Sequence, residues 1–294
     1  MRFFRNYTSR FPKTSQRLKS IGIFPISNHY YEPLFDINVL RKPLSSEREL
    51  PGIKINKQQQ LYSLEKLNYA DEIKRLNWDK MPNHKLDFYL GNGAFESGDA
   101  EFLYQFIRYY KPKRIIEIGS GNSTKVMLSA IRANELEYGQ KTDLICIEPF
   151  ENPWLESFPQ IQLIRQRIEN LNMNWSIELS SGDLLFIDSS HIIRPQGDVL
   201  EEFLRIIPSL AKGVFIHVHD VFTPRDYLES WIANEVRFWN EQYLLEALLT
   251  HTNRYQVVAA LNFLKHHEFE SLVKVCPYLT KNREPGSFYI QVID

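Results

Sequence analysis

The clearest pattern in this sequence is an alternation of short apolar runs with segments of helical periodicity. The apolar runs are rich in β-branched residues, as is typical of buried parallel strands. They predict strands over residues 114–118, 142–147, 161–165, 183–187, 213–218, 255–261 and 287–292. Apolar residues spaced three or four apart predict helices over residues 100–110, 124–137, 154–158, 198–210, 226–250 and 264–275. This alternation indicates an α/β fold, a parallel sheet with helices on both faces.

The first part of the chain lacks this regular alternation. Up to Tyr31 it contains six Lys or Arg residues and no Asp or Glu, which is typical of a transit peptide or of an irregular basic arm. A helix is predicted over residues 58–78. We therefore expect a partly irregular extension over residues 1–85 and the main domain over residues 86–294. Two roles for the extension stay open, a lid over the site and a contact between two copies in a homodimer.

A glycine turn follows the first predicted strand. A strand, a tight turn and a helix N-terminus place unpaired backbone N–H groups together, which is the geometry of a nucleotide-type cofactor site. We expect Ser123 or Thr124 to cap the helix. A glycine-containing loop over residues 91–99 precedes the strand, with Asp99 as the expected cap of the next helix, and it either touches the ligand or is a plain connection. The candidate cofactor residues of the turn are Glu117, Gly119, Ser120, Gly121, Ser123 and Thr124.

Two features of the turn bear on which cofactor it binds. The third glycine of a dinucleotide fingerprint would fall at Thr124, and the carboxylate of Glu117 suits a cationic ligand better than a pyrophosphate, which it would repel. Glu148 follows the second strand, where an acid can accept both hydroxyls of a ribose.

Further polar residues follow the fourth and fifth strands. Asp188 and His191 come after the fourth strand, and His219 and Asp220 come after the fifth. Ligands of open parallel sheets bind at the carboxyl ends of the strands, so these residues predict an active site there. His217 shares a face with His219 but lies deeper, and we expect it to be a core histidine.

Three segments resemble the class I S-adenosylmethionine-dependent methyltransferases, in the branch often encoded with glycan or natural-product pathways. They are residues 117–124, 186–191 and 213–224, and residues 239–245 are similar to a further stretch of that branch. The resemblance implies a Rossmann-like seven-stranded sheet of order 3-2-1-4-5-7-6 whose last strand is antiparallel. It also implies that S-adenosylmethionine is the cofactor, with Glu148 and Asp188 joining the residues of the turn in binding it.

The resemblance further implies a methyl transfer, most simply to an acceptor hydroxyl. His191 is the candidate general base, because neutral imidazole is available at pH 7, and Asp188, His219 and Asp220 complete the candidate catalytic set. In metal-dependent O-methyltransferases, an Asp after strand four and an Asp-Asn pair after strand five bind magnesium. The matching candidates here are Asp188, His219 and Asp220; since magnesium prefers oxygen, these residues with His191 could bind a transition metal instead.

Composition limits the classes of partner that this protein is expected to bind. The net charge of −1 predicts no broad surface for nucleic acid, and no apolar run is long enough for a membrane span. Without an apolar leader, and with only Cys146 and Cys276 as cysteines, the chain fits a reducing, cytoplasmic setting. We therefore expect a small-molecule or glycan-type acceptor.

Two alternatives stay open. A nicotinamide-dependent oxidoreductase shares the fold class, but the missing third glycine, Glu117 and the absence of a Tyr-x-x-x-Lys pair beyond strand four weigh against it. A non-catalytic protein that retains the fold is the other alternative. The cofactor that binds distinguishes the first, and the effect of His191→Ala on a folded protein distinguishes the second.

Overall fold

The computed structural model describes residues 12–24, 31, 33–82 and 84–294. Much of the predicted basic arm, residues 1–11 and 25–30, lies outside the described residues. The described residues form two compact units. One comprises the chain up to Ser46 with Tyr227–Phe238, and the other comprises Glu47–Asp226 with Trp239–Asp294.

The smaller unit contains three short helical segments. They are α3 (Pro12–Ser20), η1 (Ile37–Val39) and α11 (Glu229–Ala233). Within this unit the ring of Phe35 meets that of Phe238 edge-on, with centroids 5.1 Å apart. The boundary predicted at residue 85 does not coincide with the division between the units, because residues 47–85 belong to the unit that contains the sheet. The role of the extension as a lid or a dimer contact stays a prediction.

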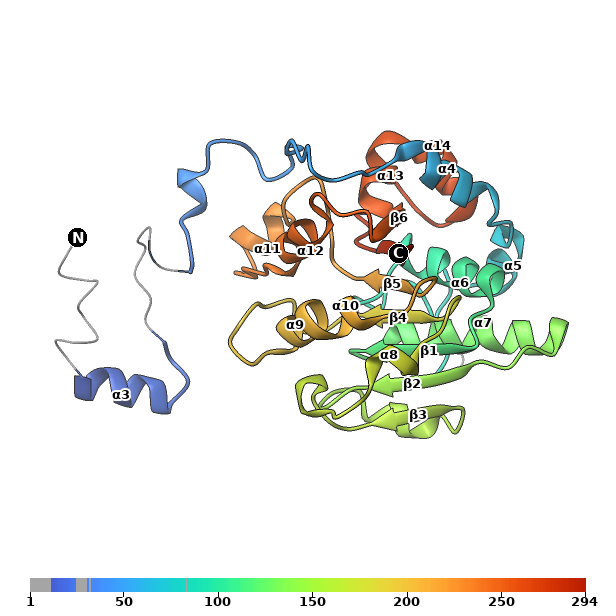
Figure 1. Ribbon diagram of the computed structural model, residues 1–294, viewed down its shortest axis with the longest axis horizontal. Helices are drawn as coiled ribbons and strands as arrows, with labels where there is room; N and C mark the ends of the chain where they lie inside the picture. The colour runs from blue at the N-terminus through green and yellow to red at the C-terminus, as the bar shows by residue number, and fades with distance from the viewer. Residues whose placement is uncertain (1–11, 25–30, 32, 83) are drawn as a thin grey trace. The chain divides into compact units, whose positions relative to one another are not determined.

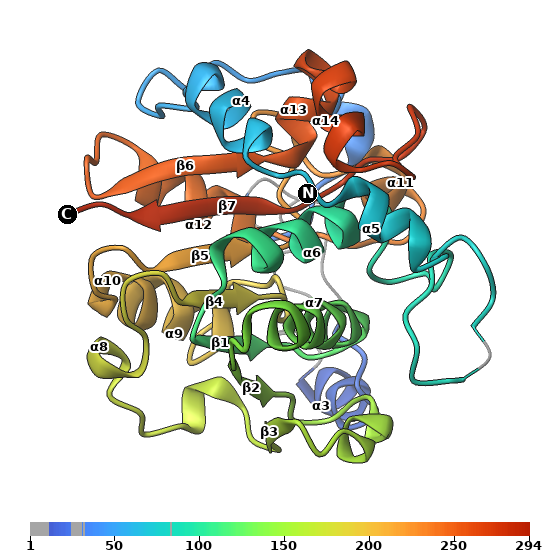
Figure 2. The ribbon, with the colours of Figure 1, turned by 90° about the vertical axis from the view of Figure 1, so that its right-hand side faces the viewer.

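The larger unit is built on a seven-stranded sheet of order β3-β2-β1-β4-β5-β7-β6, as predicted. Its strands are β1 (Arg114–Ile118), β2 (Asp143–Ile147), β3 (Ile161–Ile164), β4 (Leu184–Ile187), β5 (Phe215–Val218), β6 (Tyr255–Ala260) and β7 (Phe288–Val292). Strands β1 to β5 pair in parallel, and β7 inserts antiparallel between β5 and β6. This is the Rossmann-like sheet of class I methyltransferases, shown from two sides in Figures 1 and 2.

Helices cover both faces of the sheet. Figure 2 shows α6 and α7 on one face, while α9, α10 and α12 lie on the other. The helical segments of this unit are α4 (Lys57–Glu65), α5 (Ala70–Arg75), α6 (Asp99–Tyr110), α7 (Asn122–Tyr138), η2 (Pro153–Ser157), η3 (Ile168–Asn170), α8 (Trp175–Glu178), α9 (Asp198–Glu201), the π-helical η4 (Glu202–Ile206), α10 (Ile207–Ser209), α12 (Glu241–Leu249), α13 (Leu261–His267) and α14 (Phe269–Val275).

Side-chain alternation along the strands explains why both faces are covered. Ile115 and Phe186 belong to the hydrophobic cluster that contains residues of α6 and α7, whereas Ile116 and Leu185 belong to a second cluster. Successive side chains of a strand point to opposite faces, so an apolar run without alternation buries both. The apolar runs in the sequence therefore predicted the strands of this sheet correctly.

Three predicted helices are each two in the structure. The helix predicted over residues 58–78 is interrupted between α4 and α5, where the backbone N–H of Tyr69 donates to the side chain of Gln105 in α6. The helix predicted over 264–275 is α13 and α14, which meet at Glu268. Between α4 and α5, a contact from another part of the chain thus ends a helix that the periodicity of its own residues would continue.

The predicted helix over residues 226–250 was also wrong. It is α11 and α12, separated by a segment in which Val236 has a φ of 58°. The N–H groups of Asn240 and Glu241 donate to the carbonyl of His191 rather than to a preceding helical turn. This exchange of a helical for a tertiary hydrogen bond places the start of α12 against the loop after β4.

Two predicted helix caps were wrong as well. Gly98 caps α6, and the Asp99 carboxylate instead accepts from the backbone N–H groups of Gly286 and Ser287 before β7. Gly121 caps α7, and the predicted Ser123 and Thr124 lie inside its first turn. Within the part of the chain that the structure describes, no helix is long and apolar enough to cross a bilayer.

Candidate active site

The glycine turn between β1 and α7 is in direct contact with the end of β4. Gly119 has a φ of 82°, and a Cβ atom there would lie 1.7 Å from the carbonyl oxygen of Asp188. Only glycine allows this approach and this backbone conformation. The turn predicted to hold the cofactor and the loop predicted to hold catalytic residues are therefore neighbours.

The carboxylate of Glu117 lies behind this turn. It is fully buried, and its two oxygens accept hydrogen bonds from the hydroxyls of Ser123 and Thr124, each at 2.6 Å. Burial raises the pKa of Glu117 to about 7, although these hydroxyls lower it. These hydrogen bonds fix the position of the first turn of α7. The three side chains therefore act on cofactor binding by setting where this turn lies.

Glu148 stands at the end of β2, as predicted. Its Oε1 atom accepts from the backbone N–H groups of Phe150 and Glu151, both at 2.9 Å. Nearby, the amide of Asn152 donates to the carbonyl of Ser120 and ties this loop to the glycine turn. The carboxylate is thus held in a fixed orientation next to the turn, which suits an acceptor of ribose hydroxyl groups.

The loop over residues 91–99 also reaches this edge of the sheet. The side chain of Asn92 accepts from the backbone of Ala94 and Phe95 and from the amide of Asn122, the first residue of α7. The ring of Phe95 lies 5.1 Å from that of His219. The loop is more than a plain connection, because it contacts both the glycine turn and the residues after β5.

Side chains of two helical segments accept hydrogen bonds from the loop after β4 and so hold its shape. Ser190 donates to the carboxylate of Asp198 through both its backbone N–H and its hydroxyl, and Ser189 donates to the buried Glu202. His191 then has a φ of 60°, uncommon for a residue with a side chain. The start of α12 holds this conformation by donating to the His191 carbonyl.

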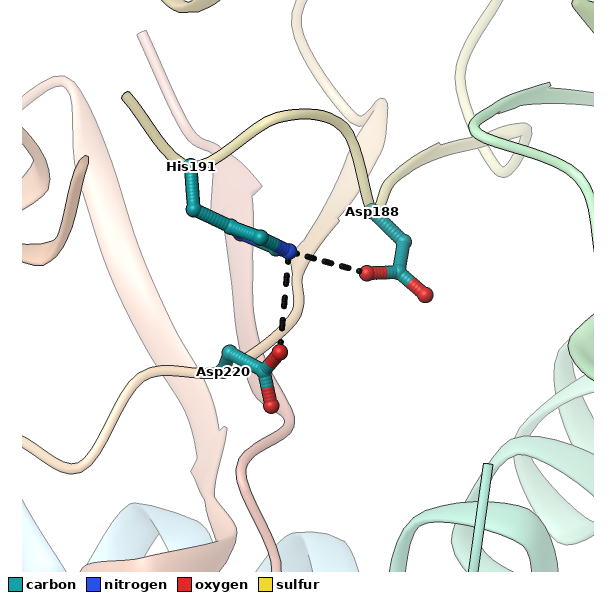
Figure 3. A group of neighbouring side chains, drawn as sticks. All are labelled: Asp188, His191 and Asp220. Atoms are coloured by element: carbon teal, nitrogen blue, oxygen red, sulfur yellow. Dashed lines mark ion pairs between the residues drawn. The ribbon is translucent and has the colours of Figure 1, made fainter. Parts of the chain in front are cut away.

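Three carboxylates surround the imidazole of His191, which is 5% exposed. Its Nδ1 atom lies 2.8 Å from Glu241 Oε2, and its Nε2 atom lies 3.3 Å from Asp188 Oδ1 and 3.5 Å from Asp220 Oδ2. Figure 3 shows Nε2 directed between Asp188 and Asp220. The ring centroid of Trp239 lies 4.3 Å from that of the imidazole.

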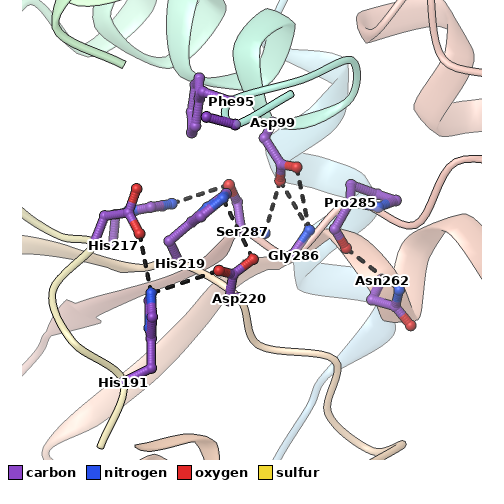
Figure 4. A network of polar contacts seen from close by, with 12 residues as sticks. Phe95, Asp99, His191, His217, His219, Asp220, Asn262, Pro285, Gly286 and Ser287 are labelled. Atoms are coloured by element: carbon purple, nitrogen blue, oxygen red, sulfur yellow. Dashed lines mark hydrogen bonds and ion pairs between the residues drawn. The ribbon is translucent and has the colours of Figure 1, made fainter. Parts of the chain in front are cut away.

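The residues after β5 form the neighbouring part of the site, shown in Figure 4. Asp220 has a φ of 57°, and the segment before β7 packs against it so closely that a Cβ atom at Gly286 would lie 3.0 Å from its Cα atom. The Nε2 atom of His219 lies 3.6 Å from Asp220 Oδ1. His217 is fully buried and bonded to Ser287, as predicted for a core histidine.

These charges change the pKa values of the histidines. Burial alone lowers the pKa of His191, but Asp188, Glu241 and Asp220 raise it, and the net shift is well upward. The pKa of His219 is also raised, since Asp220, Asp188 and Asp99 outweigh its burial. Burial lowers the pKa of His217 well below its usual value. These surroundings favour the protonated form of His191, whereas its predicted role as a general base relied on the neutral form.

The structure brings most of the predicted site residues together and adds one. Asp188, His191 and Asp220 each offer a ligand atom within 4.8 Å of the others, a grouping that could hold a metal ion. His219, predicted for that role, is not in the group. The added residue is Glu241, which lies in the stretch 239–245 that resembles the family, is 1% exposed and contacts His191. Only the tertiary contact between α12 and the loop after β4 identifies it.

Comparison with known proteins agrees with this geometry. Residues 116–221 match the model of a methyltransferase-domain family, and this segment contains the glycine turn, Glu148 and the ends of β4 and β5. An uncharacterized protein of Archaeoglobus fulgidus is 32% identical over 166 residues, which are 52% of this chain and 72% of the relative, so the two belong to one family. This chain is a class I S-adenosylmethionine-dependent methyltransferase.

Solved methyltransferases resemble it only distantly. A putative methyltransferase of Thermobifida fusca is 10% identical, with 81% of this chain and 88% of that chain covered and a TM-score of 0.37. A 1,6-didemethyltoxoflavin N1-methyltransferase of Burkholderia thailandensis, with bound 1,6-didemethyltoxoflavin and S-adenosylhomocysteine, is 11% identical, with 85% of this chain and 95% of that chain covered and a TM-score of 0.34. These likenesses are too weak to indicate an acceptor.

The residues present fit S-adenosylmethionine. Gly119 leaves no side chain between the turn and β4, and α7 begins directly after the turn, where a helix N-terminus offers backbone N–H groups to a ligand. Glu148 would accept the ribose hydroxyl groups, and Asp188 lies beside the turn with its side chain 27% exposed. When bound, the cofactor supplies an electrophilic methyl group on a positively charged sulfur, a charge that this carboxylate-rich edge favours.

Proposed function

We propose that this methyltransferase acts on a hydroxyl oxygen of a small or glycan-type acceptor. The observation that carries the proposal is the convergence of Asp188, His191 and Asp220 next to the glycine turn. A hydroxyl is a weak nucleophile until its proton leaves, so transfer to oxygen needs a proton acceptor within hydrogen-bond reach of the methyl donor. The cluster offers such groups at the edge where ligands of this fold bind.

His191 is the general base in this proposal. Its Nδ1 atom is held by Glu241, so its Nε2 atom is the one available to the acceptor hydroxyl. The base must be neutral, whereas the neighbouring carboxylates favour the protonated form. A positively charged sulfonium at the adjacent turn opposes that effect and lowers the pKa of His191, so cofactor binding itself favours the form that accepts a proton.

Trp239 supports an acceptor that contains a ring. Its indole is partly exposed and packs against the imidazole of His191, so it offers an apolar face beside the reacting atoms. Aromatic faces of this kind suit sugar rings and planar molecules. The proposed acceptors are therefore sugars, phenols and other small hydroxyl compounds, in line with the glycan or natural-product branch that the sequence resembles.

The test uses S-adenosylmethionine with a deuterated methyl group and a panel of hydroxyl acceptors with their amine analogues. Mass spectrometry locates the label, and release of S-adenosylhomocysteine gives the rate. We expect label on oxygen, and a fall in turnover of about 100-fold or more in Asp220→Asn with the cofactor still bound. Asp143→Asn is the matched control, because Asp143 is exposed at the far end of β2. Label on nitrogen, or unchanged turnover in Asp220→Asn, would contradict the proposal.

A further inference from the structure

We infer that residues 12–24 bind the surface of a bilayer that contains anionic lipids. The segment consists of α3 and the turn after it, marked in Figure 1, and it belongs to the smaller unit. The inference does not depend on which acceptor is methylated; it concerns where the enzyme is held. It adds a surface contact and no membrane span, because a nine-residue helix is only about 14 Å long.

The first argument is the uniform charge of this segment. Lys13, Arg17 and Lys19 are exposed, and none of them forms an ion pair with another residue that the structure describes. The chain up to Tyr31 contains six such bases and no acidic residue. A cluster of about four to eight bases on an amphipathic segment is typical of proteins that bind anionic lipid headgroups. The charge of this segment therefore fits a negatively charged surface.

The second argument is the group of apolar residues that follows the helix. Ile21, Ile23 and Phe24 are 70%, 49% and 65% exposed. Single apolar side chains are common on a protein surface, but three within four residues beside bases are typical of a segment that lies in the bilayer interface. The sequence before this segment has the same mixed composition, with three arginines among the aromatic residues Phe3, Phe4, Tyr7 and Phe11.

The third argument is that local hydrogen bonds fix the end of α3, while no packing covers its sides. The N–H of Ile23 donates to the carbonyl of Leu18, and the N–H of Gly22, which has a φ of 79°, donates to the carbonyl of Lys19. This Schellman motif ends a helix without contacts from elsewhere. Helices in proteins gain most of their stability by packing an apolar face, yet Leu18 is only half-buried and the other described side chains of α3 are exposed. A bilayer surface supplies the missing contact.

Charge and apolar exposure together favour a bilayer over other partners. Nucleic acid attracts the bases through its phosphates, but it offers no apolar layer for Ile21 and Ile23. The same segment of a second copy carries the same positive charge and repels the first. In a bilayer with anionic lipids, negatively charged headgroups lie directly above an apolar layer, so the bases and the apolar side chains are both accommodated.

The experiment measures co-sedimentation of the full-length protein with vesicles at about 0.15 M salt. The vesicles contain phosphatidylcholine alone or phosphatidylcholine with roughly one third phosphatidylserine. We expect the anionic vesicles to bind at least about 10-fold more tightly than the neutral ones. Lys13→Gln combined with Arg17→Gln should weaken binding about 25-fold, since each base contributes about 5-fold. Phe24→Ser should weaken it about 10-fold or more, because a phenyl ring is lost from the apolar layer.

Matched controls change exposed residues of the larger unit. Lys141→Gln combined with Lys274→Gln removes two exposed bases, and Ile177→Ser removes an apolar side chain that is 70% exposed. We expect these controls to bind vesicles as wild type does. Circular dichroism verifies that each variant is folded, as we expect for changes at exposed positions.

Several outcomes would overturn the inference. They are a folded wild-type protein that does not bind anionic vesicles, equal binding to neutral vesicles, and control variants that lose as much binding as the variants of residues 12–24. Tighter binding to a short DNA duplex, lost with the two bases but kept in Phe24→Ser, would assign the segment to nucleic acid instead. A dimer in sedimentation velocity that Phe24→Ser dissociates, without vesicle binding, would assign it to a second copy.

Discussion

The contact between Gly119 and the end of β4 allows a sharp test of how the site is built. Gly119 has a φ of 82°, and an added Cβ atom would lie 1.7 Å from the carbonyl oxygen of Asp188 and 2.6 Å from its carbonyl carbon. Both neighbours are backbone atoms, so no side chain can rotate away. Gly119→Ala must therefore separate the glycine turn from β4 or unfold both.

The expected loss of stability has three contributions. A non-glycine residue in the left-handed region costs about 1 kcal/mol or more. Relief of the contact requires the two backbones to move apart by about 1.5 Å, which breaks the bond from the Asp188 N–H to the Ile118 carbonyl and costs about 1 kcal/mol more. With the packing lost around this junction, we expect a destabilisation of roughly 3 kcal/mol or more.

Gly121→Ala is the matched control. Gly121 has an extended backbone with a φ of −160°, and a Cβ atom there would meet only the Asn152 amide nitrogen, at 3.4 Å. We expect its stability to stay within about 1 kcal/mol of wild type. Urea unfolding followed by circular dichroism gives both free energies, and calorimetry with S-adenosylmethionine shows whether each folded variant still binds. Equal stability of the two variants would refute the close approach of the turn to β4.

Two further predictions concern the cofactor and the response to pH. Glu148→Ala should weaken the binding of S-adenosylmethionine about 10- to 100-fold in calorimetry, as expected for lost hydrogen bonds to a charged group, while Glu151→Ala, at an exposed neighbour, should not; equal affinities would exclude Glu148 from the ribose site. Burial raises the pKa of Glu101 to about 7, although the N–H groups of Gly98 and Tyr278 lower it. The folded state thus binds this proton more tightly than the unfolded state, so its contribution to stability is complete below about pH 4.5 and is lost as the pH rises through about 7. Between pH 5 and pH 8 we expect wild type to lose up to about 3 kcal/mol more than Glu101→Gln in urea unfolding, and parallel pH profiles would contradict this.

The sequence alone determined the sheet and the edge at which the chemistry lies. Apolar runs buried on both faces specify strands locally, and the strand–turn–helix of residues 114–138 specifies the glycine turn through the backbone of a few neighbouring residues. Because parallel strands end at one edge, the polar residues that follow β2, β4 and β5 could be placed together before the structure was known. The resemblance to class I methyltransferases predicted the strand order, and the structure confirms it.

Only the tertiary structure decided where helices end and what each site residue contacts. The helix predicted over 226–250 is interrupted because Asn240 and Glu241 donate to His191, a residue far away in the sequence. The same contact places Glu241 on the imidazole and sets which histidine faces the two aspartates. It also surrounds His191 with carboxylates, which favours a protonated form that the isolated side chain would not have at pH 7. Local periodicity carries no information about such contacts, because hydrogen bonds and charges between distant segments depend on how the helices pack across the sheet.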